Sequence, residues 1–571
     1  MLKPRTTLRR LNRMLFEVFV VGIAAAQSVT PAAPSHDPVQ PTPTAPVHSV
    51  PKFDTLIDSA IRQEHRLIVL MRNFTPIVET YLQEEKPDSD LGTSPRTDDY
   101  FLSRLDLKGN GMTLRTFDEP EGWKEMLEKK LLKNPRPFTA VGFAQATFPD
   151  LDHFDRHNYI FKFVRWEVLG DIHCGVVDVS PREKSQNRGF LGRIWIEDRD
   201  FNIVRFTGTY TSKTLSRHAF HFDSWRLNTL GIMWMPAYVY TQESASQDPA
   251  KHNLWFKAQT RIWGYDLQHA GDHREFAKQL TDTPVWIDPS RHEASQDVNP
   301  ANTIGKTTYS PEDNIVERLQ VAGLMAPDGQ VDQILETVVN NLLVTNDLDL
   351  AGIRCRVLLT TPLESFVMGR TIVVSRGLLD VLPDEATLAA VLAHELGHIV
   401  LKHSVGAESL SGLAVPFSDL EVFTRLSFRF DTAQETAADA KGLELLLKSP
   451  YQGQLANAEL FLEALQERSA RLPNLLHSRL GNDFEGTHLT KIQPVDNPSN
   501  RLQIDRLDQI SALPLGSRIT LDPWSDRIAM LKSPPVRLQS ASEKMPFEVS
   551  PFFPYLKRQD QHEKAQAGTQ P

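Results

Sequence analysis

The chain has 571 residues, with 62 basic and 72 acidic side chains and a formal net charge of −10 at pH 7. Its length exceeds what one ordinary hydrophobic core holds, so it predicts two folded domains. The acidic balance argues against nucleic acid as a partner, because binding to phosphates needs a basic surface. A disulfide between Cys174 and Cys355 is chemically allowed after export, but two buried free thiols are the favoured interpretation.

The first 26 residues have the composition of a secretory signal peptide. An apolar run over 14–23 is followed by Ala24-Ala25-Ala26, three small residues that suit a cleavage site. Before this run lies a basic segment that contains Lys3, Arg5, Arg9, Arg10 and Arg13. Glu17 interrupts the apolar run, so an uncleaved anchor or a non-exported start is the alternative. We expect an exported protein, periplasmic or extracellular, that is soluble after signal cleavage, because no later segment is apolar enough for a transmembrane span.

Residues 27–51 are rich in Pro, Ala, Thr and Ser and predict a disordered spacer. Residues 52–300 predict a β-rich domain that begins with a helix over 53–72. Turn signals such as Asp198-Arg199-Asp200 separate its strands and indicate antiparallel hairpins. The predicted strands cover 159–169, 174–179, 192–197, 202–210, 218–226, 232–241 and 254–265.

The strand-turn-strand segment GRIWIEDRDFNIVRFTGTY, over 192–210, carries a resemblance of this domain to known proteins. A helix beside an aromatic-rich antiparallel sheet is similar to the curved half-barrel of the lipoprotein carrier LolA and related periplasmic proteins. This resemblance implies a lipid or lipoprotein as a candidate partner. The tryptophans could line a groove for acyl chains or an extended polypeptide, but filling an ordinary β core is the favoured interpretation. They are Trp166, Trp195, Trp225, Trp234, Trp255 and Trp263.

Residues 301–314 predict a linker, and residues 315–513 predict a second domain that is mainly helical with a small edge-strand sheet. The expected fold class of the whole chain is therefore α+β. The predicted elements of the second domain are helices over 331–344, 419–448 and 452–471 and a strand over 354–360. A loop over 405–418 is a candidate lid. Residues 514–571 predict a C-terminal arm that packs back onto a domain and a disordered tail.

The segment His394-Glu395-Leu396-Gly397-His398 predicts a metal site. Residues four apart in a helix lie about 40° apart around its axis, so both imidazoles face the same way and can bind one metal ion. Glu395 is placed to accept a proton from water at the metal. The run over 383–393 opens with Pro and acidic residues and continues with helix formers, so the motif is expected in a buried amphipathic helix. The alternative, two surface histidines, would interrupt an apolar stripe with polar groups.

Glu435 is the candidate for the third ligand. A catalytic zinc site commonly has three protein ligands and leaves one position open. Asp439 follows one helical turn later on the same face, where it can accept the free N–H of a histidine ligand. Ala437 and Ala438 lie between the two acids and indicate close packing of one helix on another. The alternative is that both acids lie on a solvated helix face.

The segments AHELGHIVLKH and ETAADAKGLELL resemble the zinc metallopeptidase family that includes the CAAX prenyl protease, HtpX and the periplasmic BepA. In that family the third ligand is the Glu of an ExxAD motif, which corresponds to Glu435. The resemblance covers about residues 315–510 and includes 362–379, which is similar to the family's active-site edge strand. The family commonly has Asn-Ala-Phe in this strand, and Glu364-Ser365-Phe366 replaces it here.

The resemblance also implies a downstream histidine and arginine near the reacting carbonyl. Their best counterparts here are His488 and Arg501, although the family's usual His-Pro reads His488-Leu489 in this chain. His477 is a competing candidate for the histidine. The alternative for a lone histidine in a loop is a solvated side chain without a catalytic role.

These residues predict a zinc-dependent endopeptidase that holds one zinc ion per chain between His394, His398 and Glu435. Main-chain hydrogen bonds to the strand around 365–375 would bind an extended substrate, which predicts cleavage of unfolded or flexible segments in envelope protein quality control or maturation. The alternative is a non-catalytic chaperone or a lipid- or lipoprotein-binding protein with a structural metal. Glu395 favours the enzyme, because a structural site needs no base beside its ligands.

Overall fold

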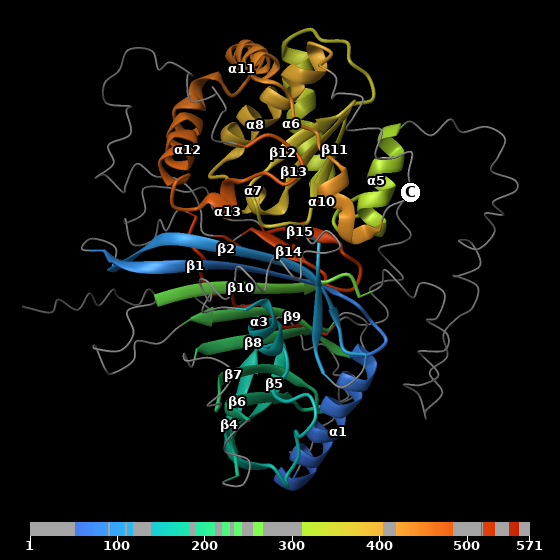
Figure 1. Cartoon of the computed structure of the whole chain (residues 1–571), viewed down its shortest axis with the longest axis vertical. Helices are drawn as coiled ribbons and strands as arrows, with labels where there is room; N and C mark the ends of the chain where they lie inside the picture. Colours follow the sequence, from blue (N-terminus) through green and yellow to red (C-terminus); the bar gives the residue numbers. More distant parts are fainter. Residues whose placement is uncertain are drawn as a thin grey trace, which may run out of the picture. The chain divides into compact units, whose positions relative to one another are not determined.

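The computed structural model shows an α+β chain with a large antiparallel sheet followed by a mainly helical part (Figure 1). The predicted signal peptide (1–26) and spacer (27–51) lie outside the residues that it describes. The described residues are 52–88, 92–108, 111–117, 139–182, 189–211, 220–228, 233–242, 255–265, 311–403, 418–483, 515–516, 518–531 and 547–558. The helix α5 (Pro311–Val321) begins inside the stretch that was predicted as a linker.

The large sheet has ten strands, all paired antiparallel, and it is not closed, because β3 and β4 are at its two ends. In spatial order the strands are β3 (Thr113–Thr116), β2 (Gly92–Asp106), β1 (Ile77–Asp88), β10 (Trp255–Trp263), β9 (Trp234–Gln242), β8 (His221–Asn228), β7 (Ile203–Tyr210), β6 (Phe190–Glu197), β5 (Ile172–Pro181) and β4 (Tyr159–Leu169). The seven strands from β4 to β10 match the predicted ones to within a few residues, whereas β1, β2 and β3 were not predicted.

The two faces of the sheet carry separate cores. The helix α1 (Phe53–Met71) packs Leu56 and Ile57 on one face, against residues such as Val239. On the opposite face, Tyr238 belongs to a cluster that includes Phe552 and Leu556 near the C-terminus. Trp195, Trp225, Trp234 and Trp263 are buried, which agrees with tryptophans that fill a core, whereas Trp166 is half-buried and stacks on His173.

The C-terminal segment packs back onto the sheet, as its sequence predicts. A short hairpin, β14 (Ile519–Leu521) and β15 (Ile528–Met530), comes first. The stretch over 547–558 then returns to the sheet, where the Asp171 N–H donates to the carbonyl of Leu556 over 2.8 Å. The arm is therefore part of the folded body in these ranges.

The helical part contains a second, three-stranded sheet in the order β11 (Arg354–Leu358), β13 (Thr371–Ser375), β12 (Ser365–Met368). The prediction of one strand around 365–375 is wrong in detail, because the chain turns at Gly369, whose φ is 58°. Around this sheet lie α6 (Gln330–Thr345), α7 (Arg376–Val381), α8 (Glu385–Val400), α10 (Val422–Arg425), α11 (Thr432–Leu447), α12 (Leu455–Arg468) and α13 (Pro473–Leu476).

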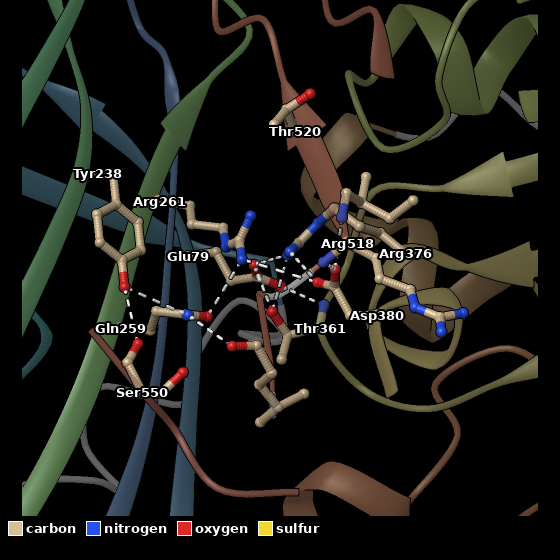
Figure 2. Close-up of polar contacts among 12 residues, drawn as sticks. Glu79, Tyr238, Gln259, Arg261, Thr361, Arg376, Asp380, Arg518, Thr520 and Ser550 are labelled. Atoms are coloured by element: carbon tan, nitrogen blue, oxygen red, sulfur yellow. Dashed lines mark hydrogen bonds and ion pairs between the residues drawn. The ribbon is translucent and has the colours of Figure 1, made fainter. Parts of the chain in front are cut away.

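Buried polar contacts join the large sheet to the helical part (Figure 2). Glu79 on β1 accepts hydrogen bonds from the Arg376 guanidinium over 2.6 Å and from the Thr361 hydroxyl over 2.7 Å. Asp98 on β2 accepts from the backbone N–H of Leu475, over 2.8 Å, in α13. The strands β1 and β2 therefore contact Thr361, Arg376 and the helix α13 in the helical part.

Within the described ranges, no helix is long and apolar enough to cross a membrane. Cys174 and Cys355 are both buried and unbonded, in agreement with the favoured interpretation of two free thiols. Burial raises the pKa of each thiol, so both remain protonated and unreactive near neutral pH.

Candidate metal centre

The helix α8 carries the HExxH motif through the middle of the helical part. It begins after Pro383, where the Asp384 carboxylate accepts a hydrogen bond from the backbone N–H of Thr387 over 2.9 Å. Every residue from 386 to 398 is buried. The helix is therefore buried on all sides rather than amphipathic, and the side chains of both histidines are buried.

The helix α11 crosses α8 closely enough to bring two more acids to the same place. A Cβ atom on Gly397 would lie 2.6 Å from the carbonyl oxygen of Ala438. A Cβ atom on Gly442 would lie 3.0 Å from the carbonyl oxygen of Ala393. Ala438 is buried in this contact, as predicted, whereas Ala437 is exposed and takes no part in it.

This close crossing leads to a testable expectation for Gly397. The change Gly397→Ala should destabilise the protein by about 1–3 kcal/mol and weaken zinc binding, because a methyl group there pushes the two helices apart. Urea denaturation and zinc competition would measure the two effects. Gly453→Ala is the matched control, since its Cβ meets nothing within 4 Å. Equal effects of the two substitutions would show that the crossing does not need the glycine.

His394, His398 and Glu435 form a three-donor cluster between the two helices. The two Nε2 atoms are 3.2 Å apart, and the Glu435 oxygens lie 3.3 Å from that of His394 and 3.5 Å from that of His398. Tetrahedral zinc with bonds of about 2.1 Å places its ligand atoms about 3.4 Å apart. The donor set and its spacing therefore fit a single zinc ion, in the arrangement that the sequence predicts.

Asp439 lies behind His394, where an outer partner of a metal ligand is expected. Its Oδ1 is 2.7 Å from Nδ1 of His394, so the Nε2 atom remains directed at the cluster. Burial disfavours the charged imidazolium, but the hydrogen bonds to Asp439 and Glu435 outweigh it and raise the pKa of His394 to about 10. Metal binding at this residue therefore displaces a proton.

His403 occupies the same position behind His398, and sequence analysis did not identify it. The two Nδ1 atoms are 3.0 Å apart. Lys402 has a φ of 57°, and the N–H groups of Lys402 and His403 bond the carbonyls of Ile399 and His398. This left-handed helix end turns His403 back onto His398. Burial, together with the two neighbouring imidazoles, lowers the pKa of His398 to about 2, so its ring is neutral and can bind a metal.

We expect His403→Ala to lower zinc affinity by about 10–100-fold, because it removes the hydrogen-bond partner that orients a ligand. Competition with a zinc-binding dye would measure the affinity directly. His403→Gln, which keeps a side-chain hydrogen-bonding group, should lose less. Wild-type affinity in His403→Ala would contradict an orienting role.

Glu395 is held beside the cluster by β12. The Ser365 hydroxyl donates to Oε1 of Glu395 over 2.6 Å. Burial raises the pKa of Glu395 to about 7, close to the value that suits a general base at neutral pH. Sequence analysis noted Ser365 only as a departure from the family pattern, and its contact with Glu395 was not predicted.

Aromatic side chains form part of the wall of a small cavity at the cluster. Phe430 stacks on His398 with ring centres 4.0 Å apart, and Phe366 stacks on Phe428 at 5.0 Å. The cavity has a volume of about 20 Å³, which accommodates one water-sized occupant. Its walls include the ligand cluster, Glu395 and Asn482. A single small reactant can therefore meet the metal ligands and the base at once.

Glu364, which stands where the family commonly has Asn, anchors a neighbouring loop. Its buried carboxylate accepts hydrogen bonds from the Ser478 hydroxyl over 2.7 Å and from the Leu480 N–H over 3.0 Å. Burial raises the pKa of this carboxyl above its ordinary value. The loop that it fixes supplies Asn482 to the cavity, so Glu364 has a structural role here.

The predicted downstream pair, His488 and Arg501, lies outside the described residues, as does the candidate lid over 405–418 except for Ser418. The competing candidate His477 does not line the cavity. Its side chain is 59% exposed and lies 3.2 Å from Asp483. Among the described histidines, therefore, only those of α8 and its C-terminal turn reach the site.

Comparison with solved structures returns distant likenesses. A putative outer membrane lipoprotein-sorting protein domain from Vibrio parahaemolyticus is 11% identical, with 39% of this chain and 98% of that chain covered and a TM-score of 0.22. A DUF1329 family protein from Desulfovibrio piger is 9% identical, with 40% and 98% covered and a TM-score of 0.21. A chain in the complex structure of MucA/MucB from Pseudomonas aeruginosa is 11% identical, with 36% of this chain and 93% of that chain covered and a TM-score of 0.12. TM-scores this low carry no argument about function.

No curated protein matches the chain by sequence. The model of Peptidase family M48, in contrast, matches residues 327–470. This range contains α8 and α11, and with them every residue of the metal cluster and Asp439. Peptidases of this family depend on a metal, typically zinc, and the donor geometry described above fits that requirement. Residues 327–470 are therefore a domain of peptidase family M48.

Proposed function

We propose that this protein is a zinc-dependent endopeptidase. The observation that carries the proposal is one small cavity shared by three metal donors and a hydrogen-bonded carboxylate, Glu395. A structural zinc site is commonly closed by four protein ligands, whereas three ligands leave a position for a reactant. The alternative of a binding protein with a structural metal has no such use for Glu395.

In the proposed reaction, His394, His398 and Glu435 hold one zinc ion, with Asp439 and His403 orienting the two rings. A bound zinc ion supplies a Lewis acid that lowers the pKa of water and polarises the peptide carbonyl. Glu395 accepts the proton of the attacking water and passes it to the leaving amine. Ser365 keeps the Glu395 carboxylate directed into the cavity while this happens.

The proposed substrate is an extended polypeptide. On one side β12 pairs with β13, and its other edge has no strand partner in the described ranges. An extended segment can add to that edge through main-chain hydrogen bonds, which favours unfolded or flexible regions over particular sequences. Because Ser365 lies at the start of β12 and contacts Glu395, such a segment would run directly past the base.

We further propose that the chain acts after export, in envelope protein quality control or maturation, and that the large sheet recruits a polypeptide, lipid or lipoprotein partner. The composition of residues 1–26, which is that of a signal peptide, supports the proposal of export.

His488 and Arg501 are proposed to stabilise the oxyanion. Loss of activity in His488→Ala, with activity retained in His477→Ala, would support that assignment.

Metal removal provides the direct test of this function. Treatment of the purified full chain with a chelator should abolish casein cleavage, and one equivalent of zinc should restore it, because the metal supplies the electrophile. A magnesium control should not restore cleavage, since the nitrogen-rich donor set does not suit that ion. Casein cleavage that survives complete zinc removal would overturn the proposal.

A further inference from the structure

A large cavity lies on the face of the sheet opposite to α1. It has a volume of about 740 Å³, within the usual range for sites that hold a small organic ligand. One wall comes from β8, β9 and β10, and the others come from the β14–β15 hairpin and the segment around 552–557. Tyr238, which lines the cavity, packs with Phe552 and Leu556 of the C-terminal segment rather than with α1.

The cavity walls are largely apolar. They include Leu227, Ile519 and Leu521, together with Phe552 and Phe553. At the rim, Phe553 is 62% exposed and Tyr555 is 68% exposed, although the hydroxyl of Tyr555 is fixed by Asp171 over 2.6 Å. Aromatic rings held in this exposed position provide an apolar surface that a ligand can cover.

Among the residues that line the cavity is a buried cation, Arg261 on β10, which is only 8% exposed. Its contacts are long: the Nη2 atom lies 3.4 Å from Oε1 of Gln259 and 3.8 Å from Oδ2 of Asp380. Among the described residues, its Nε has no hydrogen-bond partner. Figure 2 shows Arg261 between Gln259 and Tyr238 on one side and Asp380 and Arg376 on the other.

Asp380 does not neutralise Arg261 by itself. Its carboxylate also lies 3.5 Å from Arg376 and accepts the backbone N–H groups of Arg518 and Ile519. Burial, with Arg376 adding to it, lowers the pKa of Arg261 to about 10. A buried guanidinium with long contacts and a shared counter-ion gains from an additional anion at hydrogen-bonding distance.

We propose that this cavity binds a long-chain carboxylate, such as a fatty acid, with the carboxylate on Arg261 and the alkyl chain along the apolar walls. Two other cations and one acid line the cavity, and the control variant Arg527→Gln separates the rim cations from Arg261. Arg527 and Lys557 are exposed cations at the rim, and the Asp522 carboxylate is already engaged by Ser525 and Trp524. This site rests on no step of the proposed peptidase mechanism.

The test uses the full chain and measures displacement of a fluorescent fatty acid by palmitate. We expect one palmitate per chain, and octanoate should bind at least about 100-fold more weakly, because each buried methylene adds to affinity. Arg261→Met should weaken palmitate binding by about 10–100-fold through loss of the charged hydrogen bonds. Arg527→Gln is the matched control, a cation at the exposed rim, and should change binding by less than about threefold.

A second variant tests the cavity independently, so that the proposal can be judged even if Arg261→Met does not fold. Ala529 lines the cavity from an exposed position, so Ala529→Trp should block palmitate without disturbing the core, with an unchanged circular dichroism spectrum and unchanged casein cleavage. Absence of palmitate binding to the wild type would overturn the proposal. Equal affinity for palmitate and hexadecanol, or equal losses in Arg261→Met and Arg527→Gln, would overturn the assignment of the carboxylate to Arg261.

Discussion

Replacing Glu395 with Gln should lower the rate of casein cleavage by about 10²–10⁴-fold while leaving one zinc ion bound per chain. The substitution keeps the shape of the side chain and its contact with Ser365, but an amide cannot accept the proton of the attacking water. None of the three metal donors changes. The expected loss therefore appears in kcat, with little change in KM.

The zinc content of the same preparation is the control for this experiment. A variant that has lost both zinc and activity would say nothing about a base, so the two are measured together. Glu395→Gln with full zinc and wild-type cleavage would contradict the proposed role. A metal-bound variant with unimpaired peptidase activity would require a different proton acceptor in the cavity.

Replacing Glu435 with Gln should weaken zinc binding by more than about 100-fold, which exceeds the loss expected for an outer partner such as Asp439. The amide keeps the packing of α11 but is a much poorer ligand than the carboxylate, which lies 3.3 and 3.5 Å from the two histidine nitrogens. Competition with a chelating dye would give the affinity, and casein cleavage at limiting zinc should fall in parallel.

Glu444→Gln is the matched control for that experiment, because Glu444 lies on the same helix but faces solvent. Its carboxylate is 2.8 Å from Lys441 and 3.0 Å from Lys448. An exposed ion pair contributes little, so we expect a change in zinc affinity of less than about twofold. Equal affinities for zinc in Glu435→Gln and Glu444→Gln would remove Glu435 from the ligand set.

The arrangement of the metal donors could be predicted because it depends on helix geometry. His394 and His398 share a face through their spacing alone, and so do Glu435 and Asp439. The contact between the two pairs was supported by the small residues of α11, and the structure places Ala438 in that contact. Local periodicity and the family resemblance together therefore identify the cluster.

The strands β1 and β2 were missed because several of their buried positions are polar and interrupt the apolar pattern. Glu79, Gln83 and Asp98 point into the protein, where an ordinary strand would have apolar residues. These side chains are satisfied by groups distant in sequence, such as Arg376, which cannot be recognised from alternation. The seven strands with apolar inner faces were predicted, since their pattern is local.

Ser365 and His403 could not be assigned to the site from sequence for a related reason. The hydroxyl of Ser365 reaches Glu395 only because β12 lies beside α8 in the fold. His403 reaches His398 only through the left-handed conformation of Lys402, which few non-glycine residues adopt. Both contacts depend on tertiary structure or on an unusual backbone angle.

Zinc-edge X-ray absorption on the purified protein would identify the metal ligands themselves. We expect two imidazole nitrogens and carboxylate or water oxygen, all at about 2.0–2.2 Å from the metal. A sulfur shell at about 2.3 Å, which would implicate Cys174 or Cys355, would contradict this expectation. So would a spectrum with only one imidazole, since His394 and His398 would then not bind the same ion.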